Sequence, residues 1–211
     1  MTELSILEQY KKSIVFKILL GLMLFGLLVV SALYALAVGS YNLPVAEVAR
    51  ILFLGDADAT SFNVIWNIRI PRILTAIAAG AGLSVAGAAM QSILRNPLGS
   101  PFTLGISSAA AFGAAVALGV LGTGEMTSSA AEASIIVNNP YLVTICAFIS
   151  SLTATAVILV LARVIGAAPE TMILTGVALG SLFTAGTTFI QYFSDHVRIA
   201  AIIFWTFGDV G

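Results

Sequence analysis

The sequence predicts an all-α fold, a polytopic bundle of about five transmembrane helices. Of 211 residues, 59% are hydrophobic and only 9% are charged, and the mean hydropathy is +1.06. A soluble domain carries about 25% charged residues, so this chain has too few to cover a surface that faces water. Apolar runs of about 20 residues, the length that crosses a bilayer core, recur along the chain.

The sequence also argues against nucleic-acid binding, an intrachain disulfide and a cleavable signal peptide. The formal charge of −1 argues against nucleic acid, because phosphate binding needs a basic face. The single cysteine, Cys146, lies in an apolar run and has no partner for an intrachain disulfide. The apolar run after Lys17 is too long for a cleavable signal peptide.

Five windows qualify as membrane spans: 18–38, 73–93, 102–121, 141–162 and 171–191. Between the first two lies a polar segment, 39–68, in which 44–54 is expected to form a short amphipathic helix that begins with proline. A loop rich in Ser, Ala and Asn is expected over 122–140. We therefore predict one transmembrane domain over 1–211, with a head (1–17), five spans (18–191) and an outer segment (192–211) too short to cross.

Basic residues set the predicted orientation, because Lys and Arg favour the cytoplasmic side. With the N-terminus inside, five of the nine basic residues lie inside, namely Lys11, Lys12, Lys17, Arg95 and Arg163. The other four then lie outside: Arg50, Arg69, Arg72 and Arg198. Two of these, Arg69 and Arg72, break the rule close to a membrane boundary in the stretch NIRIPRIL (67–74), where Pro71 is expected to mark the helix start.

The predicted spans lack the residues that proton-coupled carriers and membrane enzymes use. No ionisable side chain lies inside a predicted span, which argues against a proton-coupled carrier. The chain has no G-x-x-x-x-G-K-[ST] and no H-E-x-x-H, and its only histidine is His196. We therefore predict a protein that is not an enzyme and that holds no cofactor or metal.

Small residues recur at four-residue spacing in three spans, and such ridges let helices approach closely. They are Gly80, Ser84 and Ala88; Ala109, Gly113 and Ala117; and Gly176, Gly180 and Thr184. Ordinary bundle packing explains any one ridge. The fifth span is also unusually polar, so the alternative that it lines a path stays open.

The stretch RNPLGSP (95–101) is typical of a tight turn between two helices. Each of its prolines disfavours helical backbone at the residue before it.

The segment RIPRILTAIAAGAGLSVAGAAMQSILRNPLGSPFTLGISSAA (69–110) resembles the FecCD-type permeases, the membrane subunits of ATP-driven importers of iron–siderophore complexes, haem and cobalamin. MILTGVALGSLFTAGTTF (172–189) and FWTFGDVG (204–211) resemble two later motifs of that family. The motif residues of the turn are Gln91, Asn96, Pro97, Leu98, Pro101 and Gly105. The match covers about 40–211.

The resemblance implies a fold and a set of partners. Family members have about ten helices, the second set repeating the first with inverted topology. The chain would thus be the N-terminal part of that fold: a fragment, a truncated frame or half of a split gene. The implied partners are an ABC ATPase subunit, whose docking loop would lie in the missing part, an extracytoplasmic binding protein, a second permease copy in a homodimer, and the lipid bilayer of a prokaryotic cell membrane.

The resemblance also implies roles for particular residues. Arg69 and Arg72 would dock the binding protein, although interfacial arginines also snorkel to headgroups. Thr175, Gly176, Gly180 and Thr184 would line the translocation path. Trp205 and Gly208 would lie at the outer vestibule, with interfacial anchoring as the equal alternative for Trp205.

We therefore expect a permease subunit for iron chelates, with iron–siderophore first and haem or cobalamin as alternatives. From another class, the chain could be a non-transporting truncated permease fragment or a small homo-oligomeric channel. No residue in the sequence names the cargo.

Overall fold

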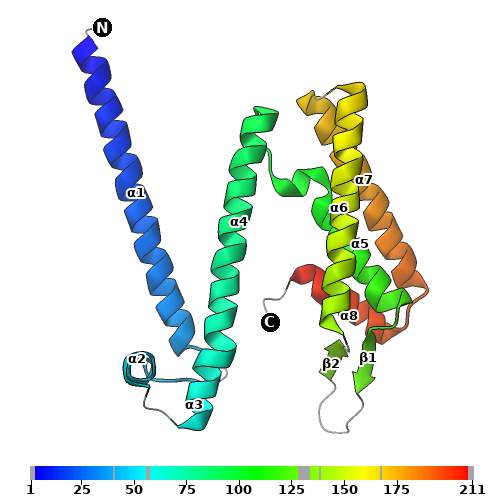
Figure 1. Ribbon diagram of the computed structural model, residues 1–211, viewed down its shortest axis with the longest axis horizontal. Helices are drawn as coiled ribbons and strands as arrows, with labels where there is room; N and C mark the ends of the chain where they lie inside the picture. The colour runs from blue at the N-terminus through cyan, green and yellow to red at the C-terminus, as the bar shows by residue number, and fades with distance from the viewer. Residues whose placement is uncertain are drawn as a thin grey trace. The chain divides into compact units, whose positions relative to one another are not determined.

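The computed structural model describes residues 3–39, 41–55, 58–127, 134–137, 139–166 and 168–208. Contacts gather into two compact units, Met1–Ala78 and Ala79–Val210, which we describe separately. Their elements are drawn in Figure 1. The first unit holds α1 (Glu3–Ala37), α2 (Val45–Leu54), α3 (Ala59–Asn63), the π-helical turn η1 (Val64–Arg69) and the start of α4 (Ile70–Leu94). The second holds the rest of α4, the 3-10 turn η2 (Pro101–Leu104), α5 (Ile106–Ala115), the π-helical turn η3 (Val116–Val120), β1 (Gly124–Thr127), β2 (Ser134–Val137), α6 (Pro140–Ile165), α7 (Pro169–Tyr192) and α8 (His196–Phe207).

The predicted polytopic helical bundle is confirmed. Among the described residues, four helices are long and apolar enough to cross a membrane: Gln9–Ala37, Ala59–Leu94, Pro140–Ile165 and Pro169–Tyr192. They contain four of the five predicted windows almost completely. The chain is therefore a membrane protein.

The third predicted window, 102–121, differs from the expectation. Its α-helix begins only at Ile106, because Gly105 takes a left-handed conformation (φ 69°) that ends the 3-10 turn started by Pro101. After Gly105 the chain forms a 10-residue α-helix and a 5-residue π turn. At about 1.5 Å per residue this helix spans roughly 22 Å, less than the roughly 30 Å hydrocarbon core. The window is apolar throughout, but it is too short to cross as one straight helix.

The second span begins much earlier than predicted. A continuous 36-residue helix runs from Ala59 to Leu94, so Pro71 lies inside it and does not mark its start. A proline ring clashes with the carbonyl four residues before it and supplies no N–H. The π turn just before Pro71, in which the amide of Ile70 bonds to the carbonyl of Ile65, widens the helix there. The local geometry thus accommodates the proline without breaking the helix.

The first unit is held together at one end of α1. Its core joins α1, α2 and η1 and consists of Leu36, Ala37, Leu43, Val48, Ile51 and Ile65. Asp58 caps α3 by accepting a hydrogen bond from the Ser61 amide (3.3 Å). Hydrogen bonds from the side chain and backbone of Ser61 lower the pKa of the exposed Asp58 carboxyl. The predicted amphipathic helix over 44–54 is confirmed as α2, with Pro44 as its N-cap.

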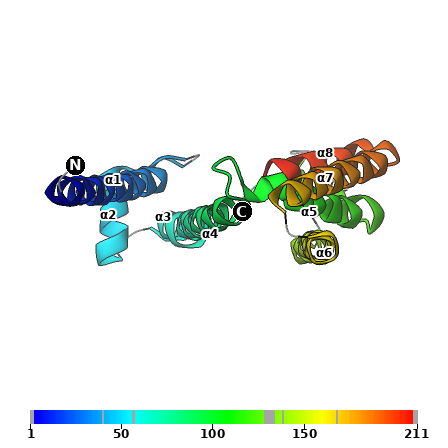
Figure 2. The ribbon, with the colours of Figure 1, turned by 90° about the horizontal axis from the view of Figure 1, so that it is seen from above.

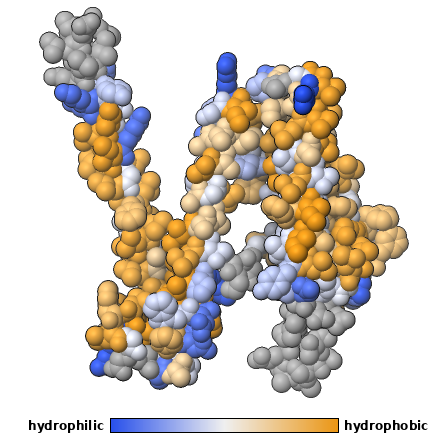
Figure 3. All heavy atoms as spheres, in the orientation of Figure 1, coloured by the Kyte–Doolittle hydropathy of each residue, from blue (hydrophilic) through white to orange (hydrophobic). Residues whose placement is uncertain are grey.

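Most of α1 presents apolar side chains that the chain itself does not cover. Its spanning window is 0% buried, and Figure 3 shows hydrophobic residues along its length. In water such a surface would be unstable. In a bilayer, lipid tails or other apolar protein surfaces cover it.

In the second unit α5 packs against both α6 and α7, and Figure 2 shows it between them. Gly113 permits the approach to α6. A Cβ atom at this position would lie 2.7 Å from the carbonyl carbon of Cys146 and 2.8 Å from Cα of Ala147. Ala109 and Ala117, the other members of the ridge, are fully buried. For this ridge, the packing interpretation is the one that the structure supports.

The loop predicted over 122–140 contains a feature that composition did not indicate. Gly124–Thr127 pairs antiparallel with Ser134–Val137, with Gly124 opposite Val137. Residues 128–133 and 138 lie outside the described part of the chain. Asn139 then caps α6 by accepting a hydrogen bond from the Leu142 amide (3.2 Å).

Replacing Gly113 with alanine is expected to destabilise the chain by about 1–3 kcal/mol, because the added methyl group meets backbone atoms of α6 that cannot move independently. The matched control is Gly82→Ala in α4, where a Cβ meets nothing within 4 Å. That change should be neutral or slightly stabilising, since alanine favours helix. Reversible unfolding in mixed micelles, followed by circular dichroism, measures both. Equal stability of the two variants would contradict this packing.

Candidate functional site

The family-motif turn between α4 and α5 is built from its own side chains. Asn96 accepts a hydrogen bond from the Leu98 amide through its side chain (2.9 Å) and from the Gly99 amide through its backbone (3.0 Å). The carbonyl of Gln91 accepts the amide of Asn96 (3.2 Å). Ser100 and Thr103 form a reciprocal capping box around Pro101. The predicted tight turn after α4 is therefore present, with α4 ending at Leu94.

The last residue of this turn, Gly105, lies against α7. A Cβ on Gly105 would fall 2.6 Å from the carbonyl oxygen of Gly176 and 2.7 Å from the amide nitrogen of Gly180. In return, a Cβ on Gly176 would fall 2.6 Å from Cα of Leu104. Backbone therefore packs directly on backbone here. Two predicted path residues, Gly176 and Gly180, act first as the contact surface for the motif turn.

Beside this contact are two neighbouring grooves, of about 710 and 1220 Å³. The smaller follows η2 and α7 and includes Gly105, Gly176, Gly180 and Thr184 in its wall. The larger lies among α5, α7 and α8 and includes Thr184, Trp205 and Gly208. Tertiary structure thus brings together Thr184, expected on the path, and the two residues expected at the vestibule. Thr175, by contrast, is half-buried and is not among the residues that line either groove.

The lining of both grooves is mainly apolar, and the polar groups within it are uncharged. Hydroxyl groups, one amide and aromatic rings make up its functional groups, and no Asp, Glu, Lys or Arg is among the lining residues. Several of them were not predicted as site residues: Phe102, Ser107, Ser108, Thr144 and Thr206. The paired serines and Phe102 belong to the sequence stretch of the motif turn, so that stretch could have suggested them. Thr144 and Thr206 come from other helices and carry no local motif.

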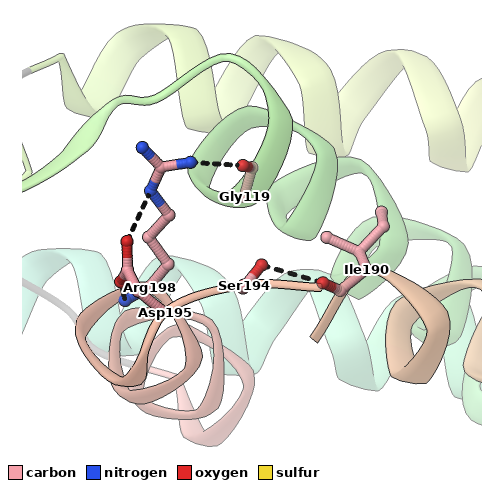
Figure 4. Close-up of polar contacts among 5 residues, drawn as sticks. All are labelled: Gly119, Ile190, Ser194, Asp195 and Arg198. Atoms are coloured by element: carbon pink, nitrogen blue, oxygen red, sulfur yellow. Dashed lines mark hydrogen bonds and ion pairs between the residues drawn. The ribbon is translucent and has the colours of Figure 1, made fainter. Parts of the chain in front are cut away.

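Within the predicted outer segment, His196–Phe207 form α8, which one arginine connects to η3. Arg198 donates from its guanidinium to the carbonyl of Gly119 in η3 (2.8 Å) and pairs with Asp195 (3.3 Å), as Figure 4 shows. Asp195 also caps α8 by accepting the Arg198 amide (2.9 Å). A cation at the C-terminal end of a helix satisfies a carbonyl that has no helical partner. Arg198 thereby holds α8, which carries Trp205, against the end of the α5–η3 helix.

In the first unit the two arginines of NIRIPRIL have different environments. Arg69 is 8% exposed, and its guanidinium donates hydrogen bonds to the backbone carbonyls of Leu36 and Tyr41. Gly39 makes room, since a Cβ there would lie 2.8 Å from a guanidinium nitrogen. Arg72, one helical turn later, is exposed. Docking stays a prediction for both, but burial does not favour it for Arg69.

No group of three or more His, Cys, Asp or Glu side chains gathers in the described part of the chain as a metal site would require. The linings of the two grooves offer uncharged hydrogen-bonding groups and apolar contact to a molecule that enters them.

Comparison with known proteins identifies the family of this arrangement. The FecCD transport family matches residues 27–211. A protein of Methanocaldococcus jannaschii that carries the name of an ABC transporter permease is 50% identical over 208 residues, which are 99% of this chain and 58% of the relative. The molybdate import system permease protein MolB of Haemophilus influenzae is 34% identical over 200 residues, covering 92% of this chain and 54% of the relative.

A solved structure supports the same fold. It is described as an inward-facing conformation of a metal-chelate type ABC transporter, and it superposes with a TM-score of 0.65 at 30% identity. The match covers 90% of this chain and 52% of that chain. The chain thus spans about half the length of the relatives that it matches.

Replacing Gly105 with alanine is expected to cost about 2–4 kcal/mol of unfolding free energy. Part of this loss comes from holding alanine in a left-handed backbone conformation, and the rest comes from the collision of its Cβ with α7. Gly122→Ala separates the two, because Gly122 has the same conformation (φ 70°) but no atom closer than 4.0 Å to its added Cβ. The control should lose only about 1–2 kcal/mol. If both variants lose the same amount, the Gly105–α7 contact is not a tight one.

Replacing Arg69 with methionine should destabilise the first unit by about 2–3 kcal/mol, because the buried carbonyl of Leu36 and the part-buried carbonyl of Tyr41 lose a charged donor. Arg72→Met should lose less than about 1 kcal/mol, since contacts of an exposed arginine are screened by solvent. Chemical unfolding in micelles measures both. A larger loss for the Arg72 variant would refute the assignment of Arg69 as the structural arginine.

Proposed function

The chain belongs to the FecCD transport family, and we propose that it serves as the membrane-spanning permease subunit of an ATP-driven importer of metal chelates, with iron chelates first. One observation carries this proposal: the larger groove brings Thr184, Trp205 and Gly208 together in an uncharged wall. Haem or cobalamin are alternative cargoes. The names of relatives support the transporter class but differ in cargo, since one is a molybdate permease.

The groove wall has the chemistry of a passage for bulky molecules. Small and weakly polar side chains let a large cargo slide without strong attachment, because each hydroxyl contributes only about 0.5–1.5 kcal/mol. Groups so weak do not trap a cargo, which a high-affinity site would do. Thr175, which is half-buried and lines neither groove, stays a predicted path residue.

Energy for transport would come from a separate ATPase subunit, because the sequence has no phosphate-cradling G-x-x-x-x-G-K-[ST] motif. A second permease copy would complete the path, and an extracytoplasmic binding protein would deliver the cargo. We place the protein in the cell membrane with its N-terminus in the cytoplasm, as the distribution of basic residues favours.

Docking of the binding protein is assigned mainly to Arg72. Its side chain is exposed at the end of the unit where α1, α2 and η1 meet, and a guanidinium suits bidentate pairing with carboxylates. Arg69 contributes indirectly, because its hydrogen bonds to α1 and to the loop after α1 fix the helix that carries Arg72. Complementary charge of this kind mainly raises the encounter rate and sets the register of docking.

Uptake tests the proposal. The permease with its ATPase and binding protein, reconstituted in proteoliposomes, should import radiolabelled iron chelate only when ATP is supplied. The Arg72→Glu variant should weaken binding-protein affinity about tenfold at low salt, with a smaller effect as salt screens the interaction. Affinity is measured by surface plasmon resonance over a range of salt concentrations.

Arg163→Glu is the matched control, since Arg163 is also exposed but lies in the last turn of α6, on the predicted cytoplasmic side. It should leave affinity for the binding protein unchanged. Absence of ATP-dependent uptake would refute the importer. Unaltered affinity of the Arg72 variant at every salt concentration would refute the docking role alone.

A further inference from the structure

Helix α2 lies across the end of α1. Figure 1 shows α2 end-on while α1 runs along the page, and Figure 2 shows the two helix axes crossing. The spanning window of α1 ends at Ala37, and the core of the first unit joins that end to Val48 and Ile51 of α2. Spanning helices are tilted on average by only about 20° from the bilayer normal. The axis of α2 therefore runs close to the membrane plane, at the level where α1 leaves the hydrocarbon.

The surface of α2 outside this core divides into an apolar side and a polar side. Val45, Ala49 and Phe53 recur every four residues and form an exposed apolar stripe, in which Val45 is 72% and Phe53 is 87% exposed. At 3.6 residues per turn, the stripe lies about 120–160° round the helix from Glu47. The half-buried Glu47 accepts a hydrogen bond from the Ser61 hydroxyl (3.4 Å), so the polar side of α2 faces α3.

This bond sets the direction of the stripe. In Figure 1, α1 extends to one side of α2 and α3 lies on the other side. Because Glu47 points toward α3, the stripe points toward the side on which α1 lies. That side holds the spanning window of α1, which is apolar and 0% buried. The stripe therefore continues the uncovered apolar surface of α1 onto α2.

One exposed apolar side chain is ordinary on the surface of a soluble protein. In α2, however, three properties coincide: an axis across a spanning helix, a position at the end of the span, and an apolar stripe that points toward the membrane. An amphipathic helix with these properties lies in the interface of a bilayer. Its apolar side enters about 5–10 Å into the boundary between headgroups and acyl chains.

We propose that α2 is an interfacial helix and that its stripe, Val45, Ala49 and Phe53, contacts lipid at the headgroup–acyl boundary of the leaflet where α1 ends. The proposal depends neither on the cargo nor on the transport activity proposed above. It gives the first unit a fixed depth in the membrane. Arg69 bonds to the end of α1 and to the loop that leads to α2, so α2 also sets the depth of the exposed Arg72.

Spin labels test the contact, because molecular oxygen concentrates in lipid whereas nickel ethylenediaminediacetate stays in water. Cys146 is the only cysteine, so the full chain carrying C146A receives one new cysteine at a time: V45C, F53C or L54C. Each labelled protein is reconstituted in nanodiscs of palmitoyl-oleoyl phosphatidylcholine. L54C is the matched control, because Leu54 is 73% exposed on the same helix. It lies only about 20° round the helix from Glu47, on the polar side.

The ratio of oxygen collisions to nickel collisions should be at least about tenfold higher at positions 45 and 53 than at position 54, because only the stripe enters the lipid. The labels at positions 45 and 53 should also lie within about 5 Å of the same depth. A helix along the membrane normal would separate them by roughly 12 Å over eight residues.

Three results would overturn the proposal. Frequent nickel collisions at positions 45 and 53 would place the stripe in water. Few collisions with either reagent would mean that protein, such as a second copy of the chain, covers the stripe. An equal oxygen preference at all three positions would show that α2 has no side facing water. The proposed importer fails in a different assay, when proteoliposomes show no ATP-dependent uptake.

Discussion

The close contact between Gly105 and the Gly176–Gly180 stretch of α7 determines the geometry of the candidate site. With no Cβ on any of the three glycines, the turn before α5 rests directly on helix backbone. This contact fixes where α5 begins, and α5 then packs on α6 through Gly113 and on α7. The smaller groove borders this contact, so the contact positions the parts of its wall that come from η2 and α7. A side chain larger than hydrogen at Gly105 would push the turn away and open that wall.

Charge is scarce in this chain, and the structure uses two arginines to satisfy backbone carbonyls. Arg69 donates to carbonyls at the end of α1 and in the loop beyond it, and Arg198 donates to the carbonyl of Gly119 in η3. Each stabilises a place where a helix ends and its carbonyls lack helical partners. In a largely apolar protein an unpaired carbonyl costs more than it would at a wet surface. This explains why Arg69 is buried in a motif whose neighbour Arg72 is exposed.

Threonine plays a related part in the grooves. A hydroxyl in an apolar helix bonds to the carbonyl four residues earlier, which satisfies its proton locally. The groove threonines therefore have their protons bonded within their own helices or turn.

The membrane class, four of the spans, the end of α4 at the RNPLGSP turn and the family could all be predicted from the sequence, because hydropathy and proline act locally. The sequence also indicated that α7 is unusually polar, and residues of α7 line both grooves. Tertiary structure was needed to show that Gly105 interrupts the third window, that a π turn keeps Pro71 inside a longer helix, and that Gly124–Thr127 pairs with Ser134–Val137. The same holds for the roles of Arg69 and Arg198, whose acceptors lie 28 to 79 residues away along the chain. The pattern of apolar residues does not identify such distant partners, because the backbone carbonyl is the same chemical group at every residue, whether it is exposed or buried.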